Sequence, residues 1–139
     1  MNVAIVYIGR DRQNQKLEDI AKALAQGLST QGHVCTIING WTDMDKRLTY
    51  FDFVIVGTES DGFISAKVPS QVRQFLRLVP GAAGKRSLGF IVKSLRSGKT
   101  LSNLMKAMEA EGMMLTCSEI IKNARDAETV GKHISIDRN

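Results

Sequence analysis

Apolar residues recur along this chain in two alternating patterns, which are continuous runs and helical repeats. The runs are rich in β-branched residues and occupy residues 3–8, 34–38, 53–57, 87–92 and 113–121. A run that is apolar at every position is typical of a strand buried on both faces. Between the runs, apolar residues spaced by three and four predict amphipathic helices over residues 17–28, 65–79, 101–108 and 124–134.

The alternation of strand and helix predicts a parallel sheet with helices on both faces and right-handed crossovers. The strand at 53–57 should be central, because Phe53–Val56 is apolar throughout. The chain has 139 residues with no internal repeat and no interdomain linker, so we expect one domain over residues 1–139. Its hydrophobic content of 43% and charged content of 24% are ordinary for a globular protein.

Several protein classes are disfavoured by composition. No apolar run approaches the roughly 20 residues that span a bilayer, and Met1–Val3 leads directly into a strand, so we expect a cytoplasmic protein without a membrane anchor. Cys35 and Cys117 both fall in predicted strands and should be reduced thiols. The two histidines, His33 and His133, have no metal-ligand spacing, so we expect no metal site.

The net charge of +5 and pI of about 9.4 favour an anionic partner. Basic side chains that are simply solvated at the surface would give the same net charge. If strands one and four end at the same sheet edge, their following loops bring Arg10, Arg12, Lys16, Lys93, Arg96 and Lys99 to that edge. Few aromatic residues belong to these loops and no nucleic-acid-binding module is present, so the sequence indicates no nucleic-acid partner.

The stretch Phe51–Gly62 combines a buried strand with a polar exit. Its apolar run ends at Gly57 and is followed by Thr58, Glu59, Ser60 and Asp61. In open α/β sheets, ligands bind beyond the carboxyl ends of the strands. The sequence therefore places a small-molecule site beside this exit.

Residues 48–58 (LTYFDFVIVGT) resemble the flavodoxin pattern of a leucine, an aromatic–Asp pair, an apolar strand and Gly–Thr. Residues 67–76 resemble the helix that follows in that family, and residues 127–134 resemble its last helix. The resemblance implies a flavodoxin-like three-layer sandwich, an α/β fold with a five-stranded parallel sheet in the order 2-1-3-4-5.

The resemblance also implies that three loops bind flavin mononucleotide (FMN). The phosphate would lie at the helix that begins near Lys16, and the ring would lie between the second and third loops. The implied cofactor-binding residues are Arg10, Arg12, Gln13, Asn14, Gln15 and Lys16; Thr58, Glu59, Ser60, Asp61, Gly62 and Phe63; and Lys93, Ser94, Leu95, Arg96, Ser97 and Gly98. Phe63 or Trp41 could flank the ring. The first loop departs from the family, because residues 9–16 contain no Ser or Thr.

Two functions follow from this resemblance. The first is an FMN-binding protein that carries electrons or assists a flavin-dependent reductase, and that is an electron carrier rather than an enzyme with its own substrate. Its basic edge would dock an acidic redox partner. The second is a protein of the same fold without flavin that acts as an interaction or regulatory module. A phosphate-binding loop of the nucleotide-hydrolysing type is disfavoured, because Lys93 stands where that motif needs glycine before Ser97–Thr100. The sequence instead predicts that Ser97 or Thr100 caps a helix.

Overall fold

The computed structural model describes residues 1–136 and contains one parallel sheet flanked by helices. The strands are β1 (Asn2–Ile8), β2 (Val34–Asn39), β3 (Phe53–Thr58), β4 (Arg86–Val92) and β5 (Met114–Ile121). The helices are α1 (Gln15–Ser29), α2 (Gln71–Leu78), α3 (Ser97–Ala110) and α4 (Ala124–His133). The strand order is β2-β1-β3-β4-β5 and every pairing is parallel, which confirms the predicted topology with β3 at the centre.

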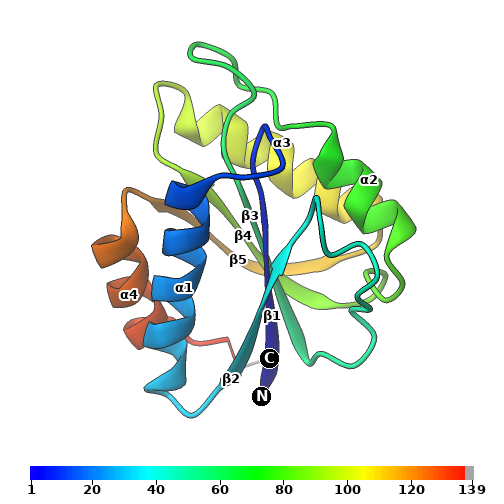
Figure 1. The fold of residues 1–139 in the computed structure, drawn as a ribbon, viewed down its shortest axis with the longest axis vertical. Helices are drawn as coiled ribbons and strands as arrows, with labels where there is room; N and C mark the ends of the chain where they lie inside the picture. The colour runs from blue at the N-terminus through cyan, green and yellow to red at the C-terminus, as the bar shows by residue number, and fades with distance from the viewer. Residues whose placement is uncertain (137–139) are drawn as a thin grey trace.

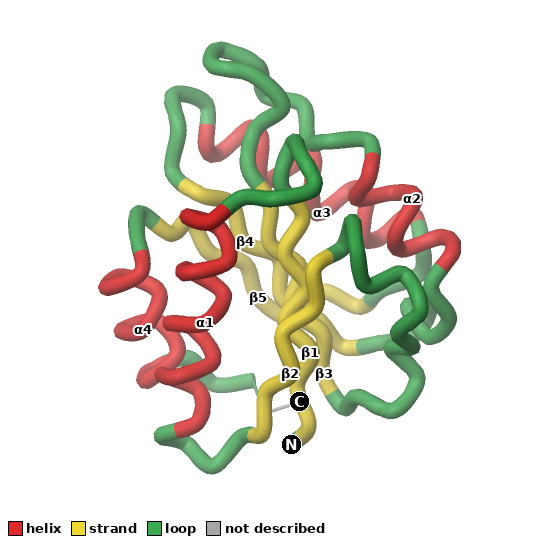
Figure 2. Tube along the Cα trace, in the orientation of Figure 1, coloured by secondary structure: helices red, strands yellow, loops and turns green. Residues whose placement is uncertain are grey.

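The helices form two layers on opposite faces of the sheet, with α1 and α4 on one face and α2 and α3 on the other (Figures 1 and 2). Side chains of a strand point alternately to the two faces. Val54 and Val56 of β3 therefore pack toward α2 and α3, whereas Phe53 and Ile55 pack toward α1 and α4. All four side chains are fully buried, as expected for a central strand covered on both sides.

The helix predicted over residues 65–79 is shorter in the structure and begins at Gln71. Pro69 disfavours helical backbone at the residue before it, Val68, which keeps residues 65–70 out of the helix. The Gln71 side chain then donates to the carbonyl of Gly40 at 2.9 Å and fixes the start of α2 against the loop after β2.

The predicted caps of α3 are also wrong, because the helix begins at Ser97 with Arg96 as its N-cap. The Ser97 hydroxyl accepts from the backbone N–H of Ser94 at 2.7 Å and donates to the Ser94 carbonyl at 2.8 Å. It therefore stabilises the turn before the helix. The Thr100 hydroxyl donates to the carbonyl of Arg96.

Glycines allow unusually close packing at two places. Gly27 of α1 and Gly131 of α4 face each other, and a Cβ added at Gly27 would lie 2.8 Å from the Cα of Gly131 and overlap the Glu128 carbonyl oxygen. A Cβ added at Gly57 of β3 would lie within 2.5 Å of three ring carbons of Phe90. These contacts hold α4 on α1 and place the Phe90 ring across β3.

The two cysteines and the lengths of the helices bear on the predictions of reduced thiols and of no membrane span. Cys35 and Cys117 lie on the two outer strands, β2 and β5, as free, half-buried thiols, and burial raises the pKa of both. Among residues 1–136, no helix combines the length and hydrophobicity needed to cross a bilayer. The same residues contain no cluster of three or more His, Cys, Asp or Glu side chains suited to a metal ion.

Candidate functional site

The loops after β1, β3 and β4 meet at the carboxyl edge of the sheet, because these three strands are parallel neighbours. The chain leaves β1 toward β2 and later returns to β3 on the other side of β1, which makes this edge the topological switch point. The loop after β3 projects beyond the sheet at the top of Figure 1. The structure thus brings the three predicted loops together.

The first loop is closed by a carboxylate from the second. One carboxylate oxygen of Glu59 accepts from the backbone N–H of Arg10 at 2.9 Å and from the side-chain amide of Asn14 at 2.7 Å. The guanidinium Nε of Arg10 lies 4.0 Å from the same oxygen. The Glu59 carboxylate therefore already accepts hydrogen bonds from Arg10 and Asn14, two of the residues predicted to bind a phosphate.

The backbone of the first loop is held from two further sides. The indole N–H of Trp41 donates to the Gly9 carbonyl at 2.8 Å, and the Asn39 amide donates to the Arg12 carbonyl at 3.0 Å. Thr58 is fully buried, and its hydroxyl donates to the carbonyl of Ile8. Trp41 therefore supports the loop from the side of β2.

The predicted phosphate ligands have other roles in this loop. Asn14 is the N-cap of α1, and its side-chain oxygen accepts from the Leu17 N–H at 2.9 Å. The Gln15 side chain donates to Asp19 at 2.9 Å. Arg12 and Lys16 are exposed and make no ion pair within residues 1–136. The Arg10 N–H and the side chains of Asn14 and Gln15 are therefore already hydrogen-bonded within the chain, and residues 9–16 have no hydroxyl group to offer a phosphate.

The second and third loops enclose a cavity of about 400 Å³ where the ring was predicted. Its lining residues come from all three loops and are Arg10, Glu59, Ser60, Gly62, Phe63, Lys93, Ser94 and Leu95. Phe63 and Leu95 are 84% and 69% exposed. This volume is within the range of small-molecule pockets, so a cavity lies where the ring was predicted.

The remaining predicted residues do not line this cavity. Gln13, Asn14 and Gln15 line a separate polar cavity of about 370 Å³ with Tyr7, Glu18, Asn39 and Thr42. Thr58 is buried in β3, and Ser97 and Gly98 belong to the first turn of α3. Asp61 and Arg96 line neither cavity. The eighteen predicted positions therefore do not form one site.

Tyr7 was not predicted to belong to this edge. Its hydroxyl donates to Glu18 at 2.9 Å, and burial, together with this hydrogen bond, raises the pKa of Tyr7 to about 12. The same hydrogen bond lowers the pKa of Glu18. Tyr7 lies near the end of an apolar strand, and Glu18 lies eleven residues later on the first turn of a helix. This spacing gives little sequence signal for the pair.

Comparison with solved structures identifies the architecture. The two-electron reduced flavodoxin of Megasphaera elsdenii superposes with a TM-score of 0.73 at 19% identity, over 94% of this chain and 96% of that one. The protein has the flavodoxin fold. A flavodoxin from the domain Archaea matches at a TM-score of 0.67 and 16% identity, over 95% of this chain and 94% of that one. The flavodiiron protein of Giardia intestinalis matches over 94% of this chain and 34% of its own length, at a TM-score of 0.59 and 15% identity.

No protein-family model matches the sequence, and neither does any curated protein. The likeness to flavodoxins is therefore one of fold, and the first loop is where this flavodoxin-fold chain differs from the pattern that its sequence resembles. The absence of hydroxyl residues from that loop is visible in the sequence. The contact of Glu59 with Arg10 and Asn14 is not, because these residues are 45 to 49 positions apart in the chain.

Proposed function

We propose that this flavodoxin-fold protein is an interaction module whose carboxyl edge docks an acidic partner protein, and that it does not bind FMN in the flavodoxin manner. The observation that carries the proposal is the position of Glu59. Its carboxylate takes hydrogen bonds from Arg10 and Asn14, at the place where the fold would otherwise receive a phosphate.

A phosphate in this loop would have to displace or approach Glu59. The side chain is 25% exposed, so repulsion between two anions there is screened less than at the open surface. Displacement would also cost the two hydrogen bonds that the carboxylate makes, and bonds to a charged group are worth about 1.5–3 kcal/mol each. Both effects act against a phosphate at residues 10–15.

Docking of a protein is supported by the surface around the cavity. Phe63, Ile64 and Leu95 expose 84%, 71% and 69% of their surface at the tips of two adjacent loops. The cations of the third loop, Lys93 and Arg96, make no ion pair within residues 1–136. An apolar centre with unpaired positive charge at its rim is complementary to an acidic protein surface.

A double variant, Leu95→Ser with Arg96→Glu, tests this surface. In affinity capture from cell extract, we expect an acidic protein to bind the wild-type chain and the variant Lys46→Gln/Arg125→Gln, which loses two charges elsewhere. The edge variant should not retain it, and rising salt should release it, because screening acts over about 10 Å at 0.1 M. Equal retention by the edge variant would contradict docking at this edge.

A second candidate function is FMN-dependent electron transfer. The cavity of about 400 Å³ between residues 59–63 and 93–95 and the likeness to flavodoxins favour it. Bound FMN would supply the redox chemistry, and Phe63 and Leu95 would contact its ring. The first loop does not fit the phosphate, so we rank this candidate second.

Titration of FMN fluorescence separates the two functions. We expect no saturable quenching by the wild-type protein at tens of micromolar. Glu59→Gln keeps the size of the side chain and removes its charge, so this variant should gain measurable quenching. Saturable quenching by the wild-type protein would establish the second function in place of the first. A riboflavin titration would then report whether phosphate contacts contribute.

A further inference from the structure

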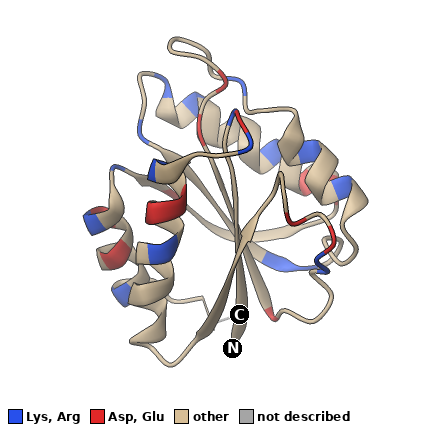
Figure 3. Ribbon diagram, viewed as in Figure 1, with Lys and Arg blue, Asp and Glu red and all other residues tan. Residues whose placement is uncertain are grey.

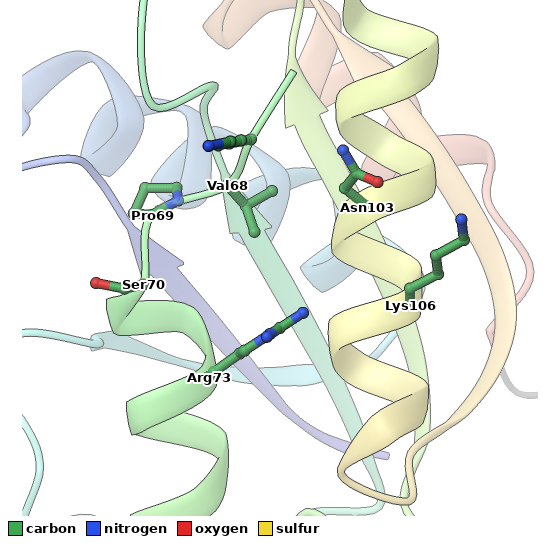
Figure 4. A pocket seen from close by; sticks show the side chains of 7 residues that line it. Val68, Pro69, Ser70, Arg73, Asn103 and Lys106 are labelled. Carbon is green, nitrogen blue, oxygen red and sulfur yellow. The ribbon is translucent and has the colours of Figure 1, made fainter. Parts of the chain in front are cut away.

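A cleft between α2 and α3 is lined by side chains that the proposed function does not use. Its volume is about 310 Å³ (Figure 4). Three cations, Lys67, Arg73 and Lys106, line it together with Val68, Pro69 and Asn103. The lining shares no residue with the cavity at the carboxyl edge, so this is a separate site.

The three cations come from three segments and have no anionic partner. Lys67 precedes α2, Arg73 lies on its first turn, and Lys106 projects from α3. No Asp or Glu lines the cleft, and within residues 1–136 none of these three side chains forms an ion pair. By contrast, Arg77, one turn further along α2, lies 3.6 Å from Glu111. The positive charge of the cleft is therefore left uncompensated.

The start of α2 adds to this positive charge. Its N-cap, Ser70, also lines the cleft, and its side chain makes no capping hydrogen bond. Helix α2, with the sequence QVRQFLRL, contains two arginines and no Asp or Glu, and its basic residues are blue in Figure 3. The positive end of the helix dipole is thus not neutralised by the chain itself.

The walls of the cleft are already in place. The Asn103 side-chain nitrogen donates to the Ala66 carbonyl at 2.9 Å, which ties the loop before α2 to α3. Arg73 extends from α2 across the cleft toward α3, where Asn103 and Lys106 lie on successive turns (Figure 4). Pro69 is buried and Val68 is half-buried, so one wall is apolar. Binding would require little reorganisation of the backbone.

We propose that this cleft binds a small organic phosphate monoester. The guanidinium of Arg73 can bind two phosphate oxygens at once, and the ammonium groups of Lys67 and Lys106 add point charges. The organic part of the ligand contacts Val68 and Pro69. The volume of about 310 Å³ limits this part to a group of roughly one ring, since it lies at the lower end of the range for small-molecule pockets.

Phenyl phosphate is the probe, and backbone amide shifts in NMR spectra are the measurement. We expect saturable shifts for residues 67–73 and 103–106 at millimolar concentrations. Inorganic phosphate should bind more weakly, because it has no apolar part to contact Val68 and Pro69. In the variant Arg73→Gln/Lys106→Gln, affinity for phenyl phosphate should fall at least about tenfold, since two charged hydrogen-bond donors are lost.

The matched control is Lys46→Gln/Arg125→Gln, which removes the same charge at exposed positions elsewhere and should bind phenyl phosphate as the wild type does. Equal loss in both double variants would overturn the site, because the effect would then come from net charge alone. Equal affinity for inorganic and phenyl phosphate would overturn the monoester assignment. If a glutamate-rich peptide shifts the same amides and phenyl phosphate does not, the monoester assignment would be overturned, and the cleft would instead be a docking site for an acidic polypeptide.

Discussion

Gly57→Ala should destabilise the protein by about 3 kcal/mol, near the upper end of the usual cost of overpacking a core. Gly57 pairs with Phe90 in the parallel ladder between β3 and β4, and the Phe90 side chain is fully buried. A methyl group at position 57 would lie within 2.5 Å of three ring carbons. The ring has no free space to move into, so the two central strands must shift. Urea unfolding measures the change.

Two further variants test whether the contact between the added methyl group and the Phe90 ring causes the loss of stability. Gly98→Ala adds the same methyl group where no other atom lies within 4 Å, and we expect it to be neutral or slightly stabilising in the first turn of α3. Phe90→Leu, placed in the Gly57→Ala background, should recover part of the lost stability because the smaller side chain leaves room for the methyl group. Gly57→Ala with the unfolding midpoint of the wild type would contradict the described packing.

Gly27→Ala should release α4 from α1. Alanine gains up to about 1 kcal/mol of helix propensity over glycine, which alone would stabilise α1. The added carbon would, however, meet the backbone of α4 at Glu128 and Gly131, and backbone cannot rotate away as a side chain can. We therefore expect a net loss of about 2–3 kcal/mol, because overpacking exceeds the gain in propensity.

Amide hydrogen exchange is the measurement that identifies where stability is lost. In Gly27→Ala, the amides of residues 124–133 should lose protection before those of β3. Gln26→Ala is the matched control, because Gln26 is the exposed neighbour on the same helix and its replacement leaves the contact between the two helices unchanged. Full protection of α4 in Gly27→Ala would show that the helices do not need this close approach.

The strands were predictable because they follow from local pattern, whereas their order came from the resemblance to flavodoxins. Phe53–Val56 is apolar at every position, and only a central strand covered on both faces satisfies that pattern. The start of α2 differs from the prediction because the apolar spacing of residues 65–79 fits a helix, whereas Pro69 disfavours helical backbone at Val68. Gly57 was interpreted as the end of a strand, whereas β3 continues to Thr58 and Gly57 makes room for a ring from the next strand.

The candidate site was only partly predictable, for a different reason. The absence of Ser and Thr from residues 9–16 is visible in the sequence, but the binding of Glu59 to Arg10 and Asn14 depends on the three-dimensional shape of two loops. The cleft between α2 and α3 is equally invisible, since Arg73 and Lys106 look like solvated helix surface until the two helices are placed side by side. Side-chain groups that meet across loops and helices have no characteristic spacing.

The contact between Gly27 and Gly131 joins α1 to α4, two helices that lie far apart in the sequence. During synthesis, the face of the sheet that carries Phe53, Ile55 and Phe90 therefore stays partly uncovered until α4 has left the ribosome. Apolar surface exposed for that interval is a substrate for chaperones and a cause of aggregation. The sheet face that packs against α1 is fully covered only when α4 has docked, so a nascent chain that stalls before residue 124 would keep part of that apolar face exposed to solvent.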